Sequence, residues 1–357
     1  MALTKVSTGV VDMSGNTGGL VIAKGTTVQQ PTCDASILGS IRENTDSGVN
    51  NIQVCTSTGW KFLKEAGSTD TPLIVDYLVV AGGGGGASAY GASGAGGGAG
   101  EFLYKTAQTL TTGGSGYTVT VGAGGIGGQA TSSTTGSAGA QGGDSVFIQT
   151  TKGGGLGRPA GGSPAGFYVG SDGGSGGGGA FNGAGGASTA VSPGLGFAGG
   201  SGYPTTSYGC GGGGGAGSAG INGTTNTGGA GGAGVQNSIT VASGSGPYYA
   251  AGGGGGLYNL YNGGVGGSSI GGSSYYYQNA TDGAANTGSG GGGACAYSGN
   301  VYLGGAGGSG VVILRYPSGF AITFQTGVGF ISSTATLSAT SEKVTTITAG
   351  SGTIIFS

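Results

Sequence analysis

The chain has 357 residues, of which 98 are glycine and 8 are proline, and its 10 basic and 12 acidic residues give a net charge of −2. Without a Gly-X-Y period it is not a collagen, and without clustered Lys and Arg it lacks the surface that nucleic-acid binding requires. No apolar run approaches the roughly 20 residues that span a bilayer, and the N-terminus lacks the pattern of a secretion signal. The mean hydropathy of +0.11 and the low net charge are unlike those of disordered chains, so we expect an ordered, soluble protein with no membrane insertion and no nucleic-acid partner.

The N-terminal residues 1–71 predict a small β module. Residues 39–45 and 52–60 alternate polar and apolar side chains and are separated by polar turns, which is the pattern of short strands. Trp60 is the single tryptophan, and we expect it to pack on a hydrophobic face rather than to bind a ligand.

Residues 72–316 predict one glycine-rich domain. It opens on the strand 73–80 and closes on the strand 311–316, and both segments are rich in β-branched residues. Three further segments predict strands that would anchor the glycine tracts: 101–104, 117–121 and 145–149.

The glycine tracts predict a bundle of polyglycine-II helices. Such helices have three residues per turn and no internal hydrogen bonds, so every N–H and C=O is available to a neighbouring helix. Alanine should lie on the outer face or against the sheet, and Ala230 and Ala233, three residues apart, share one face of a three-fold helix. The alternative is a set of flexible linkers, but linkers usually contain Ser and charge, whereas these tracts are nearly pure Gly and Ala.

The C-terminal residues 317–357 predict a separate small β unit with Thr- and Ile-rich strands at 322–324, 334–337, 344–347 and 352–356. No segment shows a sustained period of 3.6 residues. The predicted fold class is therefore mostly β and irregular, with almost no α-helix.

The four cysteines leave two alternatives open. Cys33 with Cys55 and Cys210 with Cys295 are candidate disulfides by local context, but free thiols are equally compatible with a reducing compartment. The chain has no histidine and no CxxC spacing, which argues against zinc. We expect no metal and no cofactor.

The composition also argues against an enzyme. The absence of histidine removes the usual general base, and the carboxylates are too sparse to form a catalytic pair. We expect Asp144, Asp172 and Asp282 to be turn residues whose side chains bond to nearby backbone.

The inserts between tracts are rich in Tyr, Ser, Thr and Asn, a combination that suits recognition. If successive tracts are antiparallel, the inserts alternate between two ends of the bundle. Counting places Tyr90 and the candidate receptor-binding residues at one end, which we prefer as the receptor face: Tyr203, Tyr208, Tyr248, Tyr249, Tyr275, Tyr276 and Tyr277. The opposite end would hold Phe167, Tyr168, Phe197, Tyr258, Tyr261, Tyr297 and Tyr302. The alternative is that these rings merely cap the bundle against water.

The segments 77–86, 117–125 and 307–316 resemble the glycine-rich domain of bacteriophage tail-fibre and adhesin proteins. The resemblance covers about two thirds of the chain and implies a polyglycine-II domain whose tip loops contact a receptor on the host cell, either a protein or a glycan. It also implies a virion location, other tail proteins as partners, and a homo-oligomer, with a trimer favoured. Residues 23–27 and 39–45 with Gly59-Trp60 are similar to a module of phage structural proteins, which would serve attachment or oligomerisation.

The sequence leaves three candidate functions. The leading hypothesis is a non-enzymatic tail-fibre or receptor-binding protein, and the second is a structural filament or extracellular appendage without receptor binding. The third is ice binding, which needs a flat, regular Thr or Ala face that the irregular aromatic inserts do not provide.

Overall fold

A computed structural model describes residues 23–25, 27–29, 31–44, 51–57, 59–62, 73–129, 136–161, 168–204, 209–258, 263–295 and 300–357. The chain divides between Thr71 and Pro72 into two compact units, which we describe separately. In agreement with the predicted fold class, the described residues are strands and irregular segments, with two short 3-10 turns and no α-helix. Among them no helix is long and apolar enough to cross a membrane.

The first unit is a four-stranded sheet in the order β1-β2-β3-β4. Its elements are β1 (Ala23–Gly25), η1 (Thr27–Gln29), β2 (Ile41–Asn44), β3 (Asn51–Thr56) and β4 (Gly59–Phe62). Cys33 and Cys55 form a disulfide with Cα atoms 5.5 Å apart, so one of the two candidate cysteine pairs is bonded. Trp60 donates its Nε1–H to the carbonyl of Pro31 at 2.8 Å, and the Arg42 guanidinium lies 5.8 Å from its ring centre.

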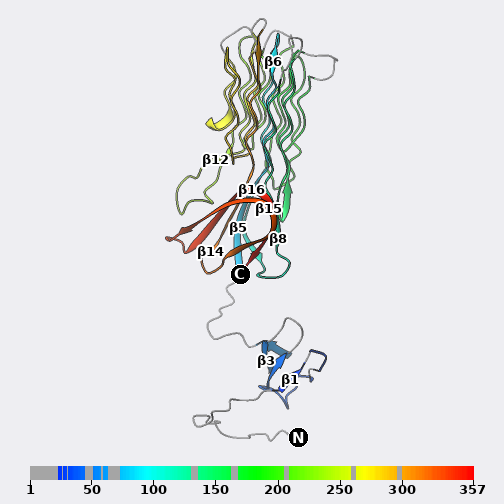
Figure 1. The fold of residues 1–357 in the computed structure, drawn as a ribbon, viewed down its shortest axis with the longest axis vertical. Coiled ribbons are helices and arrows are strands. Elements are labelled where there is room, and N and C mark those ends of the chain that lie inside the picture. Colours follow the sequence, from blue (N-terminus) through cyan, green and yellow to red (C-terminus); the bar gives the residue numbers. More distant parts are fainter. Residues whose placement is uncertain are drawn as a thin grey trace. The chain divides into compact units, whose positions relative to one another are not determined.

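The second unit begins with an eight-stranded, nearly closed sheet (Figure 1). The order is β10-β9-β8-β16-β14-β5-β7, and β15 also pairs with β16. The strands are β5 (Leu73–Val80), β7 (Phe102–Leu110), β8 (Tyr117–Thr120), β9 (Ser145–Phe147), β10 (Gln149–Thr151), β14 (Val311–Pro317), β15 (Ile322–Leu337) and β16 (Glu342–Phe356). The predicted strand 145–149 is thus two strands, because Ile148 has a φ of 59° and reverses the chain between them.

The C-terminal hairpin is an integral part of this sheet, so the prediction of a separate unit at 317–357 is wrong. β16 pairs along one edge with β14 through residues 342–347 and then with β8 through residues 351–354. A separate unit was predicted because the Thr-rich strands look independent in sequence. In the fold, Ile347, Ile354 and Phe356 complete the core that β5 and β14 begin.

The sheet has a packed face on each side. One face holds a cluster of buried rings and aliphatic side chains, in which Tyr77 meets Phe147 edge-on at 5.1 Å. On the other face, Leu78 and Ile313 pack against Ile239 and Tyr249 from the loop that precedes and includes β12 (Tyr248–Tyr249). β12 pairs with β11 (Val235–Gln236).

The glycine tracts extend from this sheet as a bundle of side-by-side extended segments (Figure 1). Every third residue of a tract donates its N–H to the same neighbour. In the tract 81–87, Gly82 and Gly85 donate to the tract 137–143, Gly83 and Gly86 to 304–310, and Gly84 and Ala87 to 94–100, at 2.8 to 3.0 Å. The carbonyls of the same tract accept N–H groups from three other tracts, 122–129, 152–158 and 289–295. A three-residue period and six bonded neighbours are the geometry expected of polyglycine-II helices.

Glycine is required in the interior because neighbouring carbonyls occupy the space of a side chain. A Cβ built on Gly213 would lie 1.9 Å from the carbonyl oxygen of Gly97. As predicted, Ala230 and Ala233 lie on the outside of the bundle, half-buried and exposed respectively. Ala95 departs from the prediction, because it is fully buried with Ala160 and Cys210 inside the bundle.

Each tract runs between the sheet and the opposite end of the bundle, which we call the tip. Tracts leave β5, β8 and β10 toward the tip and return into β7, β9 and β14. At the tip β6 (Ala89–Tyr90) pairs with β13 (Val301–Tyr302). Away from the tip, reversals occur at Gly173–Gly174, at residues 217–219 and at η2 (Gly267–Ser269), the last of which lies part-way along the bundle (Figure 1).

Candidate functional site

The tip gathers most of the tyrosine-rich inserts that the structure describes. Its described residues are 88–93, 129, 136–137, 159–161, 168, 181–182, 201–204, 224–227, 257–258, 274–280 and 300–303. Hydrogen bonds join these inserts to one another: Asn182 N–H donates to the carbonyl of Tyr203, and Ala280 N–H donates to that of Leu303, both at 3.0 Å. The inserts therefore form one composite surface rather than separate loops.

The predicted site residues divide between the two ends. Tyr203 and Tyr275–Tyr277 lie at the tip, whereas Tyr208 lies outside the described residues. Tyr248 and Tyr249 lie at the sheet end, so placing them on the same face as Tyr203 is wrong. Tyr249 is 5% exposed and packs against Phe102, which makes it a core residue.

The insert count also separated residues that the fold brings together. Tyr168, Tyr258 and Tyr302 were assigned to the opposite end but lie at the tip with Tyr90. The count also left out the turn at Phe181–Asn182, which has only two residues, with positive φ values of 25° and 53°. Phe167, Tyr261 and Tyr297 lie outside the described residues, and Phe197 lies within a tract.

Two aromatic groups are built into the tip. Tyr168 and Phe181 meet edge-on with ring centres 5.2 Å apart, over the small residues Ala92 and Ala180. Tyr258 and Tyr302 pack on a second pair of small residues, Ala89 and Ala294. Small residues below the rings allow the bundle backbone to approach, so these rings are half-buried and fixed in place.

Among the described residues of the tip, Tyr275, Tyr276 and Tyr277 form the most exposed aromatic group. Tyr275 and Tyr277 are 47% and 48% exposed, and the ring of Tyr276 lies beside that of Tyr277 with centres 4.0 Å apart. Tyr277 has a φ of 58°, so the backbone at this position is in the left-handed region. Exposed rings on a strained turn can contact a partner without first leaving a core.

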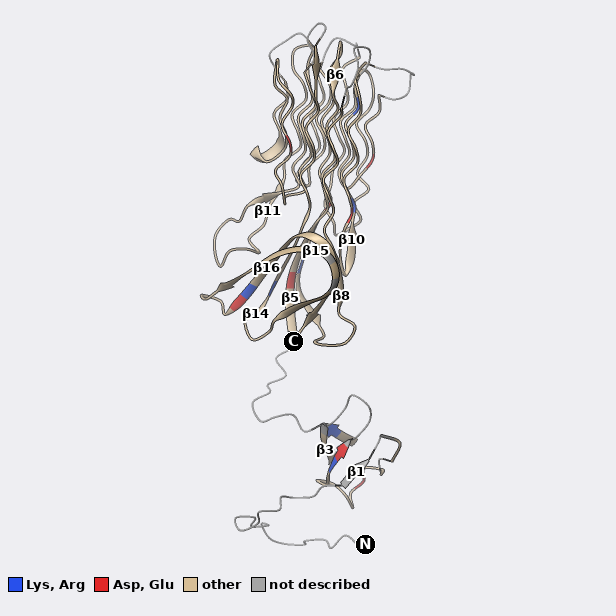
Figure 2. Cartoon of the chain, in the orientation of Figure 1, with Lys and Arg blue, Asp and Glu red and all other residues tan. Residues whose placement is uncertain are grey.

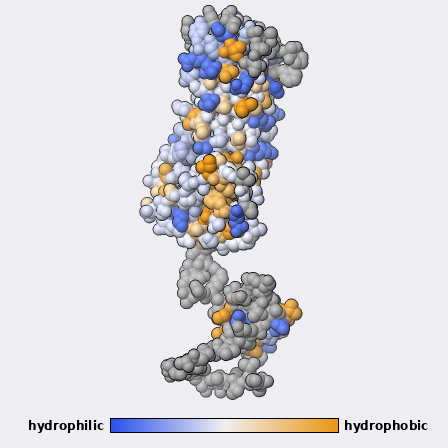
Figure 3. Space-filling view, in the orientation of Figure 1, coloured by the Kyte–Doolittle hydropathy of each residue, from blue (hydrophilic) through white to orange (hydrophobic). Residues whose placement is uncertain are grey.

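The tip carries almost no charge. Between Gly153 and Leu314 the sequence has three charged residues, Arg158, Asp172 and Asp282. In Figure 2 the charged residues along the bundle are few and scattered. On the face in Figure 3, hydrophobic residues occur as separate patches over the sheet and along the bundle. The tip therefore offers rings, amides and hydroxyls rather than an electrostatic field.

Cys210 and Cys295 are free thiols near the tip, so the second candidate disulfide is not formed. Both are buried, and burial raises the pKa of each thiol above its ordinary value. For Cys210 the neighbouring Cys295 adds to this effect, and for Cys295 hydrogen bonds with Ser274 and with the N–H of Leu257 oppose it.

The three tract aspartates bond to backbone, as predicted, but to distant tracts rather than to their own turns. Asp144 accepts the N–H of Gly153 at 2.9 Å, Asp172 that of Ala187 at 2.6 Å and Asp282 that of Ala306 at 2.7 Å. The partners are 9, 15 and 24 residues away, so the prediction of local turn residues is wrong. These carboxylates instead join neighbouring tracts.

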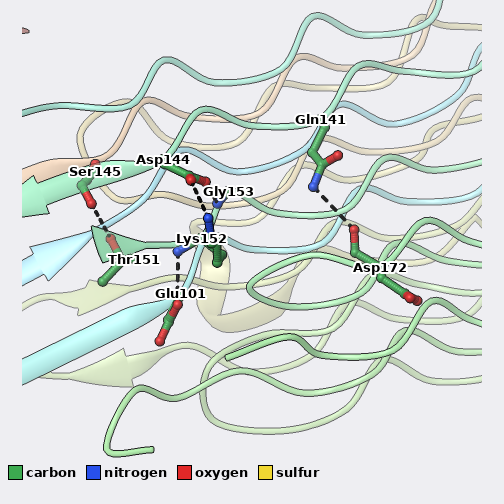
Figure 4. A network of polar contacts seen from close by, with 8 residues as sticks. All are labelled: Glu101, Gln141, Asp144, Ser145, Thr151, Lys152, Gly153 and Asp172. Atoms are coloured by element: carbon green, nitrogen blue, oxygen red, sulfur yellow. Dashed lines mark hydrogen bonds and ion pairs between the residues drawn. The ribbon is translucent and has the colours of Figure 1, made fainter. Parts of the chain in front are cut away.

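The junction of sheet and bundle contains a network of polar contacts (Figure 4). Glu101 is 3% exposed and accepts the N–H groups of Lys152 at 2.9 Å and Val191 at 3.2 Å. Burial raises the pKa of Glu101, although those two hydrogen bonds and the charge of Lys152 oppose the shift. Lys152 also forms an ion pair with Asp144 at 2.8 Å. Because each carboxylate in this network accepts backbone N–H groups, the network is suited to holding tract ends in place.

A shallow pocket of about 320 Å³ lies beside Glu101, between Val191 and Thr150. Glu101 is the single carboxylate in its lining, and both of its oxygens are hydrogen-bonded. Within the described ranges no three acidic or sulfur ligands come together in a possible metal site.

Comparison with known families gives a match to the sequence profile of a family described as "Glycine-rich domain", over residues 66–317. The match covers more than half of the chain. The chain belongs to this glycine-rich domain family. The match spans the whole bundle together with the strands β5 and β14 that bracket it. No curated protein matches the chain significantly.

Proposed function

We propose that this glycine-rich domain protein is a non-enzymatic receptor-binding protein of a phage tail fibre, and that the tip is its receptor-contacting face. The observation that carries the proposal is the gathering of Tyr90, Tyr168, Tyr203, Tyr275–Tyr277 and Tyr302 at one end of the bundle. Tyrosine offers a large contact at low entropic cost, and the surrounding Asn, Ser and Thr supply adaptable hydrogen bonds.

The bundle suits this role as a rigid support. Its tracts are bonded to their neighbours along their length, so the tip inserts start from fixed points. A rigid scaffold with variable loops is the arrangement that many binding proteins use. In the proposal the first unit serves attachment to other virion tail proteins or oligomerisation, with a trimer favoured by the resemblance.

The second candidate is a structural filament or appendage protein. The observation that favours it is the same hydrogen-bonded bundle, which would resist extension without any receptor. The two functions differ in their use of the tip, because a filament has no requirement for exposed rings there.

The test replaces the exposed rings. We expect the variant Tyr275→Ser, Tyr276→Ser, Tyr277→Asn to lose most adsorption to host cells, with Asn chosen because it tolerates the positive φ of Tyr277. The matched control is Tyr248→Ser, which removes a ring that is 40% exposed at the sheet end. Adsorption of virions carrying each folded variant is measured at equal particle number. Equal adsorption by the tip variant and the parent would overturn the proposal and favour the filament.

A further inference from the structure

Beside the tip, three adjacent tracts form a groove of about 300 Å³. The tract that begins at Leu303 is its floor, and residues 126–129 and 279–282 are its walls. The backbone bonds fix this order, since Gly304 N–H donates to the carbonyl of Gly128, and Gly283 N–H donates to that of Ala306. The floor is low because it carries the small residues Gly304 and Ala306.

Each of the three tracts contributes three lining residues to the groove, and the first and last of these are three apart in sequence. The pairs are Ile126 with Gln129, Asn279 with Asp282, and Leu303 with Ala306. A spacing of three places both members of a pair on the same face of a three-fold helix. The groove is therefore a regular product of the bundle geometry.

The polar side chains of the groove are oriented by the backbone and keep one free atom each. Asp282 uses Oδ1 to accept the N–H of Ala306, Asn279 uses Oδ1 to accept that of Leu303, and Gln129 uses Nε2 to donate to the carbonyl of Gly127. Within the part of the chain that the structure describes, Asp282 Oδ2, Asn279 Nδ2 and Gln129 Oε1 have no hydrogen-bond partner. One donor and two acceptors thus remain beside the apolar Ile126, which is 66% exposed.

We propose that this groove binds one ring of a neutral sugar. A sugar hydroxyl both donates and accepts, so neighbouring hydroxyls can pair with a carboxylate oxygen, an amide N–H and an amide oxygen at once. The apolar side chains of Ile126 and Leu303 can cover the C–H face of the ring. The lining contains Asp282 and no Lys or Arg, which disfavours anionic ligands.

The groove lies at the lower end of the size range of ligand sites, which suits a single ring rather than an extended peptide. Its biological role rests on the proposed receptor function, since a sugar site beside the tip would make a host glycan part of the receptor. Binding itself is a property of the purified chain and is tested without cells.

In the test, glucose, galactose, mannose and N-acetylglucosamine are titrated separately into the purified full chain. Binding of each sugar is detected by saturation-transfer NMR. We expect at least one sugar to bind and inorganic phosphate not to bind. Asp282→Asn keeps the acceptor for Ala306 N–H but removes the charged Oδ2, and should weaken binding by about tenfold, the value of one charge-assisted hydrogen bond. Asp172→Asn is the matched control, because Asp172 makes the same kind of backbone bond outside the groove.

A second variant, Ala306→Trp, fills the groove from its floor and should abolish binding, because Ala306 is half-buried on the outside of its tract. Failure of all four sugars to bind would overturn the proposal, as would equal binding by the parent, Asp282→Asn and Ala306→Trp. Either result leaves the adsorption test of the tip rings unaffected. Loss of adsorption in the tip variant with intact sugar binding would separate the two sites.

Discussion

The ring of Tyr249 lies against that of Phe102, with centres 6.5 Å apart, at the point where the loop 237–247 returns to the bundle. Phe102 is the first residue of β7, and Tyr249 is the last residue of β12. The contact therefore ties the bundle to the outer face of the sheet. This contact indicates that Tyr249 stabilises the fold rather than taking part in recognition.

We predict that Tyr249→Ala lowers the free energy of unfolding by about 3 kcal/mol, the low end for removing a buried aromatic ring. Tyr248→Ala should change it by less than about 0.5 kcal/mol, because the ring of Tyr248 is partly in solvent. Denaturant unfolding of the two variants and the parent gives both values. Equal destabilisation by the two variants would contradict the assignment of Tyr249 to the core.

The second prediction concerns the bundle interior. Gly213→Val should cost more than about 3 kcal/mol of stability or prevent folding, because its Cβ would lie 1.9 Å from the carbonyl oxygen of Gly97. Ala233→Val adds the same branched side chain on the exposed side of a tract and should be nearly neutral. The thermal midpoints of the two variants are compared with that of the parent. An unchanged midpoint in Gly213→Val would mean that the tracts are not close-packed.

Much of this fold could be predicted from residue type because a polyglycine tract has few ordered alternatives. The strand Leu73–Val80 was predicted at its observed bounds, and the three-residue period of hydrogen bonds follows from the proposed helix. The direction of the tracts could not be predicted. Reversals at Gly173–Gly174 and at η2 are made of glycine and serine, so they have the same composition as the tracts they interrupt.

The candidate site was predicted only in part, because residue type does not show at which end of the bundle an insert lies. Tyr203 and Tyr275–Tyr277 were grouped correctly, but Tyr248 and Tyr249 were added because an aromatic insert that packs on a sheet looks the same as one that faces solvent. The groove beside the tip was missed. Its signal was the three-residue spacing of Asn279 and Asp282, which has meaning only once the three-fold helix is assumed.

A third prediction concerns pH. Glu342 on β16 accepts hydrogen bonds from Nε of Arg315 on β14, at 2.7 Å, and from its Nη2. Burial opposes ionisation of Glu342, but the hydrogen bonds from Arg315 and Thr340 and the positive charge of Arg315 outweigh it and lower the pKa of Glu342. A lowered pKa in the folded state means that the unfolded chain binds the proton more tightly. The stabilisation is therefore present above the unfolded value, about 4.3, and is lost as pH falls through the lower folded value.

Glu342→Gln should accordingly lower the free energy of unfolding by about 1 kcal/mol at pH 7, with the difference from the parent shrinking below about pH 4. Urea unfolding at pH 7, 5, 4 and 3 measures this difference. A difference that stays constant across this range would show that the charge of Glu342 is not responsible.

The last prediction concerns the thiols. Cys210 and Cys295 are at most 1% exposed, and burial raises the pKa of both, so the native protein should contain almost no reactive thiolate at neutral pH. We expect no reaction with an aromatic disulfide reagent at pH 8 in the native state, and two thiols per chain after unfolding without reductant. Unfolding after reduction should give four, because the Cys33–Cys55 disulfide contributes the other two.

The variant Cys210→Ser separates accessibility from pairing in this experiment. It should give one thiol on unfolding and remain unreactive when native, since Cys295 is held by its own hydrogen bonds with Ser274 and Leu257. No thiol in the unfolded, unreduced parent would mean that Cys210 and Cys295 are bonded to each other. Two reactive thiols in the native parent would instead show that the tracts below the tip open to solvent, which is incompatible with a close-packed bundle.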